Sequence, residues 1–415
     1  MGNRDRQEEN NTALNDRSYR ESVPALLFWY EYNARILPWR EDPTPYHVWI
    51  SEIMLQQTRV EAVRAYYARF LEEFPDVRAV AAASEDRLVK LWEGLGYYSR
   101  VRNLAKAAKL LCAEYDGQLP ADIALLRKIP GIGDYTAGAI ASIAFGKAVP
   151  AVDGNVLRVF ARVTGYREDI RSDSFRKQVA EQLRKALSAY ITEKTFQSMM
   201  DSHATTVQSA PGRFNQAVMD IGATVCIPNG KPHCDVCPLS HLCKAFAEDL
   251  TGEIPKKAVK KARPVEKKTV LLIRCGEYVL LHRRPQKGLL AGMWELPNVE
   301  GHLSARAVAK TVSELLKRLA SEPNETDEKP GQEIPLKTHR LEDSRHVFSH
   351  VEWEMRGYRI TVKNDNEYLH PVSVESNEFM QSTSVENDEY GWFTPEEIAD
   401  KIGLPQAFHA YKLQL

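Results

Sequence analysis

Leu126-Arg-Lys-Ile-Pro-Gly-Ile-Gly-Asp-Tyr-Thr-Ala137 sets the fold of the first half of the chain. Its centre, Pro130–Gly133, lies between two segments of helical character, which predicts a helix–hairpin–helix. Gly131 and Gly133 let the backbone turn sharply and leave amides exposed at the start of the next helix. Such amides bind a DNA phosphate without reading the base sequence. An ordinary glycine-rich turn between helices is the alternative, and the surrounding LxxIPGIGxYTA pattern favours DNA binding.

The helical pattern extends well beyond this turn. Apolar residues recur at spacings of three and four over residues 21–250, and this period predicts an all-α domain. Residues 1–20 are polar and charged, and they predict a frayed tail. Residues 251–268 are rich in lysine and are punctuated by prolines, which predicts a basic linker.

The pattern changes in residues 269–415. Two short apolar runs separated by Cys-Gly-Glu predict a β-hairpin, and two further strands and one helix are expected. The hairpin strands cover 269–274 and 278–282, the other strands 346–355 and 358–362, and the helix 305–319, while the polar stretch 321–332 is expected to be a mobile loop. The predicted fold class is therefore multi-domain, with an all-α domain followed by a small α+β domain.

Length and charge limit the possible functions. The 415 residues suffice for two or three domains, and the hydrophobic content of 43% is that of a globular protein. A net charge of −1 excludes an overall basic protein, so nucleic-acid binding must come from local patches and backbone amides. The N-terminal residues lack the apolar core of a signal peptide, and no apolar run spans a bilayer. We therefore expect a cytoplasmic protein, associated with the nucleoid in a bacterium.

Four of the six cysteines lie close together in the sequence. Cys226, Cys234, Cys237 and Cys243 follow a C-x7-C-x2-C-x5-C spacing. Thiolates clustered in this way indicate an iron–sulfur cluster, a zinc ion or disulfides. Disulfides are the weakest of the three, because thiols stay reduced in the cytoplasm. The spacing therefore predicts a metal centre and leaves the metal open.

Two acidic residues lie in settings that suit paired carboxylate chemistry. Glu52 is flanked by Trp49, Ile53 and Leu55, and apolar surroundings raise a carboxyl pKa toward the range of a general acid. Asp153 precedes a predicted helix, and an ionised carboxylate there can face a developing positive charge. The alternatives are the polar edge of an amphipathic helix for Glu52 and a helix N-cap for Asp153.

Five motifs together resemble the MutY-type adenine DNA glycosylase family of the endonuclease III superfamily. They are LPWR (Leu37–Arg40), WISEIMLQQTRV (Trp49–Val60), WEGLGYYSRVRNL (Trp92–Leu104), PGIGDYTAGAI (Pro130–Ile140) and AVDGNVLRV (Ala151–Val159). The family removes adenine mispaired with 8-oxoguanine or guanine in duplex DNA. Bifunctional members of the superfamily carry a lysine where this chain has Tyr135. A tyrosine cannot form an imine, so the resemblance implies a monofunctional enzyme.

The resemblance implies roles for particular residues. The catalytic ones are Glu52 as proton donor to adenine N7, Asp153 as stabiliser of the sugar cation, and Tyr135 and Asn155 as their helpers. The DNA-contacting ones are Arg40, Gln57, Thr58, Leu95, Tyr97, Gly131 and Gly133. Among them, Gln57 and Tyr97 are expected to wedge into the duplex, with Thr58 and Leu95 on the 8-oxoguanine side. The expected partner is duplex DNA, bound by a monomer.

The family carries a [4Fe–4S] cluster, and the resemblance implies Cys226, Cys234, Cys237 and Cys243 as its ligands. The first gap between these cysteines is one residue longer than is usual in the family. His233, which lies beside Cys234, is an adjacent substitute ligand.

Residues 269–415 resemble the Nudix-like domain with which the same family recognises 8-oxoguanine. Phe348 and Ser349 are the residues expected at the lesion. True Nudix enzymes hold magnesium with a glutamate-rich helix, whereas the predicted helix here has the single Glu314, which cannot build that site. Two alternatives stay open: a glycosylase of the superfamily with another base preference, and a lesion-binding iron–sulfur protein without catalysis.

Overall fold

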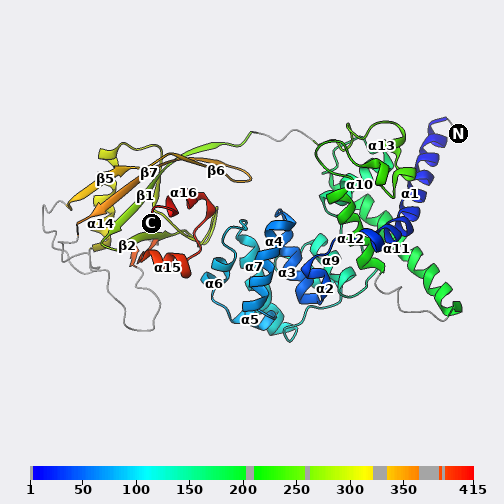
Figure 1. Ribbon diagram of the computed structural model, residues 1–415, viewed down its shortest axis with the longest axis horizontal. Coiled ribbons are helices and arrows are strands. Elements are labelled where there is room, and N and C mark those ends of the chain that lie inside the picture. Colours follow the sequence, from blue (N-terminus) through cyan, green and yellow to red (C-terminus); the bar gives the residue numbers. More distant parts are fainter. Residues whose placement is uncertain (1–2, 202–209, 258–261, 321–333, 364–382, 386–387) are drawn as a thin grey trace. The chain divides into compact units, whose positions relative to one another are not determined.

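The computed structural model describes residues 3–201, 210–257, 262–320, 334–363, 383–385 and 388–415 (Figure 1). Two compact units divide the chain between them. The first unit is Met1–Ala82 with Asn103–Lys260, and the second is Ala83–Arg102 with Lys261–Leu415. The chain therefore enters the second unit twice.

Helices build the first unit, which confirms the predicted all-α class. They are α1 (Asn3–Asn33), α2 (Pro38–Glu41), α3 (Pro45–Leu55), α4 (Val60–Glu73), α5 (Val77–Ala82), α8 (Ile123–Leu126), α9 (Asp134–Ile143), α10 (Gly154–Thr164), α11 (Asp173–Asp201), α12 (Ala210–Thr224) and α13 (Lys244–Ala247), with the short 3-10 helices η1 (Cys234–Val236) and η2 (Ser240–Leu242). α7 (Ser99–Glu114) begins in the second unit and continues into the first. Within the described ranges, no helix is both long and apolar enough to cross a membrane.

The N-terminal residues differ from the prediction. Helix α1 begins at Asn3, so residues 3–20 of the stretch predicted to be a frayed tail form the first turns of a long helix. Later turns of α1 are fixed by packing, because Tyr19 and Val23 are fully buried. A helix anchored in this way can extend into a polar stretch that has no apolar pattern of its own.

Helices α8 and α9 form the predicted helix–hairpin–helix. Ile129 and Ile132 are buried beneath the turn and hold it on the unit. Gly131 has a φ of +81°, and a Cβ there would lie 2.8 Å from Cβ of Asn103 on α7. The turn therefore needs glycine for its left-handed backbone and for its close approach to α7.

One apolar core joins α1, α10, α11 and α12. Phe160 of α10 stacks on Tyr19 of α1 with ring centroids 4.9 Å apart, and Phe214 of α12 is fully buried. Where α12 crosses α10, a Cβ at Gly222 would lie 2.7 Å from Cβ of Asn155. Glycine at position 222 therefore lets α12 lie directly against the first turn of α10.

Over the residues that the structure describes, the second unit is built on a nine-stranded mixed sheet. Its strands are β1 (Val265–Cys275), β2 (Tyr278–Arg283), β3 (Trp294–Glu295), β4 (Asn298–Glu300), β5 (Leu336–Arg340), β6 (Ser344–Val347), β7 (Glu352–Val362), β8 (Thr383–Val385) and β9 (Asp388–Phe393). The main order is β5-β7-β1-β2-β9-β8, with β3 beside β2, β4 beside β1 and β6 beside β7. Strands β1 and β7 run parallel, and the other neighbouring pairs are antiparallel.

Helices cover both faces of this sheet. Along β1, Val270 and Leu272 join a cluster that contains residues of α15 (Pro395–Asp400), η3 (Gln406–Phe408) and α16 (His409–Lys412). Leu271 and Ile273 point to the other face and pack against α14 (Ala305–Ala320). Successive side chains of a strand alternate between faces, so this nearly continuous apolar run is what a strand buried on both sides requires.

The hairpin and the helix predicted in this domain are confirmed, with two differences. Strand β1 begins at Val265, so the last residues of the predicted linker are already paired in the sheet. The two strands predicted over 346–355 and 358–362 are divided differently. The chain turns after Val347, and β7 then runs unbroken from Glu352 to Val362. The stretch 321–332, predicted to be a loop, lies outside the described residues.

Helix α6 (Glu85–Leu91) belongs to the second unit by its contacts. The Nζ of Lys90 donates to the carbonyl oxygens of Ile398 and Ile402, each at 3.2 Å. The sequence assigned this segment to the helical domain, because a helical period reports local structure and carries no information on distant partners.

The close packing of α9 at Gly138 leads us to expect that a larger residue there destabilises the protein. A Cβ at this position would lie 2.5 Å from the carbonyl oxygen of Pro150. We expect Gly138→Ala to lower the free energy of unfolding by about 1–3 kcal/mol, because backbone would have to move away from the new methyl group. Chemical denaturation measures this change. Gly252→Ala is the control, since no heavy atom lies within 4 Å of a Cβ there; equal losses in both variants would contradict the packing argument.

Candidate active site and nucleic-acid interface

Four predicted catalytic residues meet at one pocket of the first unit. Glu52 comes from α3, Tyr135 from α9, Asp153 from the residue that caps α10, and Asn155 from its first turn. The pocket spans about 780 Å³ including its open mouth. Arg40 and Thr58, predicted to contact DNA, also line it.

Glu52 occupies an environment that suits a proton donor. Its side chain is almost wholly buried, at 5% exposure, and burial raises its pKa to about 7. A hydrogen bond with Tyr135 opposes this rise, whereas the nearby charge of Asp153 adds to it. Among the described residues, Oε2 of Glu52 has no hydrogen-bond partner. This oxygen can therefore carry a proton near neutral pH and give it to a group that enters the pocket.

Asp153 is held by hydrogen bonds on both carboxylate oxygens. Its Oδ1 accepts from the backbone amides of Asn155 and Val156, each at 2.8 Å, and its Oδ2 accepts from Nδ2 of Asn155 at 2.8 Å. Burial raises the pKa of Asp153, and these hydrogen bonds oppose the rise. The residue is an N-cap and a pocket residue at once, so the two interpretations of its sequence setting are compatible.

Tyr135 lines the same pocket as Glu52 and Asp153. Burial is the main cause that raises its pKa well above the ordinary value, with the charges of Glu52 and Asp153 acting in the same direction. Its hydroxyl also lies 3.8 Å from Sδ of Met219 on α12. The side chain is therefore a neutral phenol that can donate or accept hydrogen bonds but cannot act as an amine nucleophile.

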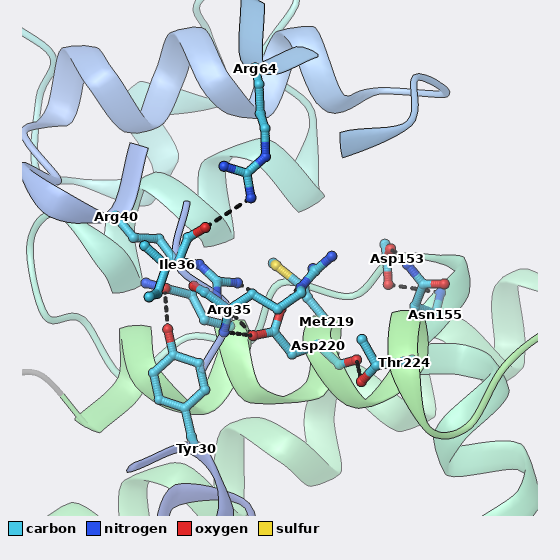
Figure 2. Close-up of polar contacts among 12 residues, drawn as sticks. Tyr30, Arg35, Ile36, Arg40, Arg64, Asp153, Asn155, Met219, Asp220 and Thr224 are labelled. Atoms are coloured by element: carbon cyan, nitrogen blue, oxygen red, sulfur yellow. Dashed lines mark hydrogen bonds and ion pairs between the residues drawn. The ribbon is translucent and has the colours of Figure 1, made fainter. Parts of the chain in front are cut away.

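A buried ion cluster that the sequence analysis missed fixes Arg40 in this pocket (Figure 2). Asp220 of α12 is fully buried and accepts from Nη1 and Nη2 of Arg40 at 2.8 and 2.9 Å. It also accepts from Nε of Arg35 at 2.7 Å. The charge of Arg40 slightly opposes the raised pKa of Glu52. The available signal was a single acidic residue in the otherwise apolar centre of α12, since such residues are rarely buried without a partner.

Arg158 connects the pocket to the cysteine loop. Its Nη2 donates to Oδ1 of Asn155 at 2.9 Å and to the carbonyl oxygen of Gly222 at 2.6 Å. Its Nε donates to the carbonyl oxygen of Cys226 at 2.9 Å. One guanidinium therefore sets the side chain of Asn155, which in turn holds Asp153.

The four clustered cysteines line one apolar hollow, together with His233, that spans about 370 Å³ including its open mouth. All six cysteines of the chain are free, so no disulfide joins them. Burial, with the neighbouring cysteines adding to it, raises the pKa of Cys237 to about 12 and of Cys243 to about 11. Over the part of the chain that the structure describes, no three metal-ligand side chains are already arranged around one point. Four thiols around one hollow nevertheless fit a metal centre, because a cation is what stabilises several adjacent thiolates.

The hairpin turn suits phosphate binding by its backbone. Gly133 is the N-cap of α9, and nothing lies within 4 Å of a Cβ built there. The first amides of any helix have no acceptor within that helix. Open space beside Gly133 therefore leaves room for an anion to approach the start of α9.

The two predicted wedge residues share a rare backbone conformation. Gln57 has a φ of +58° and Tyr97 a φ of +49°, a region that non-glycine residues adopt infrequently. Gln57 is exposed, and Tyr97 is 44% exposed although it is a large aromatic residue. Leu95, by contrast, is buried at 6% exposure, so its side chain is not presented at the surface. Strained residues of this kind gather at functional sites.

Phe348 and Ser349 lie in the tight turn between β6 and β7. The ring of Phe348 packs edge-on against Trp353 with centroids 4.9 Å apart, and its amide donates to the carbonyl oxygen of Val351 at 2.9 Å. Ser349 is exposed, and its carbonyl oxygen accepts from Nε of Arg263 at 3.2 Å. The turn therefore has a packed base and an exposed polar tip.

Each of the two units matches a known protein family. Residues 50–187 match the model of the HhH-GPD superfamily base excision DNA repair protein, and residues 269–413 match that of the NUDIX domain. The adenine DNA glycosylase of Arabidopsis thaliana is 38% identical over 66% of this chain and 46% of that protein. The adenine DNA glycosylase of Mus musculus is 32% identical over 81% of this chain and 70% of that protein, and that of Buchnera aphidicola subsp. Baizongia pistaciae is 35% identical over 66% and 72%. The chain thus spans less than half of the plant relative and 70% or more of the other two. This chain belongs to the adenine DNA glycosylase family.

Proposed function

We propose that this protein hydrolyses the N-glycosidic bond of adenine mispaired with 8-oxoguanine or guanine in duplex DNA, and leaves the DNA strand intact. The observation that carries the proposal is the pair of carboxyl groups in one pocket. Glu52 has a pKa of about 7 and an oxygen available to a ligand, while Asp153 is held by three hydrogen-bond donors. Family membership supports the choice of base.

The pocket suits a stepwise cleavage. Glu52 donates its proton to N7 of the extruded adenine, so the base departs as a neutral molecule while the sugar becomes cationic. Asp153 faces this cation, and Asn155 and Tyr135 keep the carboxylate and the sugar in place. Water then attacks the sugar, positioned by the ionised Glu52. The absence of an amine at Tyr135 means that no imine forms there, so the product is an intact strand with an abasic site.

Extrusion of adenine costs a few kcal/mol, and side chains must fill the gap left in the duplex. We assign this role to Gln57 and Tyr97, which are exposed and conformationally strained. Gly131 and Gly133 present the backbone amides of the hairpin turn to a phosphate. Phe348 and Ser349 contact the 8-oxoguanine. Such an enzyme works where the genome is, which in a bacterium is the nucleoid.

We assign the cysteine loop to a [4Fe–4S] cluster held by Cys226, Cys234, Cys237 and Cys243. All four thiols line one apolar hollow, which supports a single shared centre. When bound, such a cluster would supply the positive charge that four adjacent thiolates need, while Arg158 of α10 holds the loop by its hydrogen bond to the carbonyl oxygen of Cys226. Zinc is the alternative metal with these ligands.

The proposal predicts a specific excision pattern. Under single-turnover conditions, duplexes with A:8-oxoG, A:G, A:T and T:G pairs should lose adenine only opposite 8-oxoguanine or guanine. Strand breaks should appear only after alkali, because the enzyme leaves abasic sites. Excision at T:G would point to another base preference, breaks without alkali would contradict monofunctional chemistry, and tight binding without excision would indicate a recognition protein.

Excision should depend on pH through Glu52. Glu52 is protonated below its pKa of about 7 and loses its proton as pH rises. The rate of adenine excision, measured with enzyme at a concentration below that needed to saturate the DNA, should therefore fall by about tenfold per pH unit above that value. Glu52→Gln cannot donate a proton and should be slower than the parent by about 10²- to 10⁴-fold below pH 7, while still binding DNA. Glu61→Gln, an exposed residue of α4, is the control. A parent rate that stays constant through pH 7 would remove Glu52 from the role of acid.

The metal assignment predicts the colour and content of the purified protein. It should be yellow-brown, with iron and acid-labile sulfide in equal amounts by elemental and chemical analysis. Cys237→Ser should lower the iron content and the thermal midpoint together, whereas Cys275→Ser, in the core of the second unit, should leave the iron content unchanged. A colourless protein with one zinc per chain would contradict the assignment.

A further inference from the structure

Arg100 is buried inside the turn that leads to the predicted wedge Tyr97. It lies in the first turn of α7 and is only 7% exposed. Its Nη2 donates to the carbonyl oxygens of Leu95 and Gly96 at 3.0 and 2.9 Å, and its Nε approaches that of Tyr97 at 3.4 Å. One planar guanidinium therefore contacts three consecutive backbone carbonyls.

Two aromatic rings flank the same guanidinium. Its central carbon lies 5.4 Å from the ring centroid of Trp92 and 5.7 Å from that of Tyr97. Trp92 is fully buried, and its Nε1 donates to the carbonyl oxygen of Gly96 at 3.3 Å. Burial lowers the pKa of Arg100 to about 10, so the group keeps its charge near neutral pH. Arg100 thus packs against the buried ring of Trp92 and contacts both the backbone and the ring of Tyr97.

The turn itself has an unfavourable backbone. Gly94, Gly96 and Tyr97 all have left-handed conformations, with φ of +99°, +69° and +49°. Glycine adopts this region readily, but tyrosine does so at a cost in free energy that surrounding contacts must offset. The hydrogen bonds to Arg100 involve the carbonyl oxygens of this same stretch. They are therefore the contacts best placed to hold Tyr97 in its strained form.

We propose that Arg100 is a positioning residue for base extrusion, which holds the Leu95–Tyr97 backbone so that the ring of Tyr97 enters the duplex. This inference rests on the proposed adenine glycosylase function, and it assigns Arg100 a role that acts through Tyr97. An arginine that binds a DNA phosphate directly has to expose its guanidinium at the surface. The guanidinium of Arg100 is instead buried and bonded to carbonyl oxygens of the turn. A lysine would keep the charge but lose the planar fork that spans several acceptors.

The test compares Arg100→Lys with Arg102→Lys in the full-length protein. Arg102 lies on the same helix, and its Nε bonds the carboxylate of Glu85 at 2.6 Å instead of the turn. Three quantities are measured: single-turnover excision from A:8-oxoG duplex, fluorescence of 2-aminopurine at the target position on binding, and the thermal midpoint. We expect Arg100→Lys to slow excision on the order of 10- to 100-fold and to weaken the fluorescence rise, with a thermal midpoint near that of the parent. Arg102→Lys should resemble the parent in all three.

A double-mutant cycle separates positioning from general stability. If Arg100 acts through Tyr97, Arg100→Lys should slow excision little further in a Tyr97→Ala background. Losses that multiply, or a fall in the thermal midpoint that matches the loss of activity, would mean a structural role and overturn the inference. So would an Arg100→Lys variant with parental excision and fluorescence.

The experiments distinguish failure of the proposed function from failure of the inference about Arg100. A parent protein that excises no adenine from A:8-oxoG would refute that function. In that case the fluorescence comparison still decides whether Arg100 governs unstacking of the target base, because this signal does not require bond cleavage.

Discussion

A carboxyl group buried in an apolar pocket stays ionised only if donors replace the water it has lost. This constraint gives Glu52 and Asp153 of the first unit different roles. Asp153 receives two backbone amides and one side-chain amide, all at the start of α10. Glu52 lies in the middle of α3, where the backbone amides are already bonded within the helix, and its pKa rises to about 7. Two carboxyl groups in one pocket thereby acquire different proton affinities, as acid–base chemistry requires.

The same constraint explains the buried arginines around the pocket. Asp220 is fully buried and is neutralised by Arg35 and Arg40, which places a guanidinium on the pocket wall. The guanidinium of Arg158 is also held in place, because it donates hydrogen bonds to Asn155 and to two backbone carbonyl oxygens at once. Removing one partner of such a cluster leaves a buried charge that water cannot reach. Each charged residue is therefore held in place by its partners, and together they keep the pocket wall in one conformation.

Local patterns in the sequence predicted much of this arrangement. The hairpin turn, the capped start of α10 and the apolar setting of Glu52 each show within a dozen residues, so one segment suffices to identify them. The acidic residue in the apolar centre of α12 was a signal for Asp220, but its partner Arg40 and the contacts of Arg158 with Gly222 and Cys226 lie far along the chain and could not be identified. The predicted tail failed for a related reason: helix α1 is anchored by Tyr19, whose stacking partner is Phe160. The strand division near β7 failed because apolar alternation does not show where a chain turns between two strands of similar composition.

The second unit has a consequence for the order in which the protein forms during synthesis. Its segment Ala83–Arg102 leaves the ribosome early, whereas the carbonyl groups that receive Lys90 belong to Ile398 and Ile402. Closing so long an interval is entropically costly and must wait for the last residues of the sheet and its covering helices. The helical unit can therefore assemble most of its core while α6 still lacks its neighbours Ile398 and Ile402, so the packing of α6 is among the last parts of the molecule to be completed.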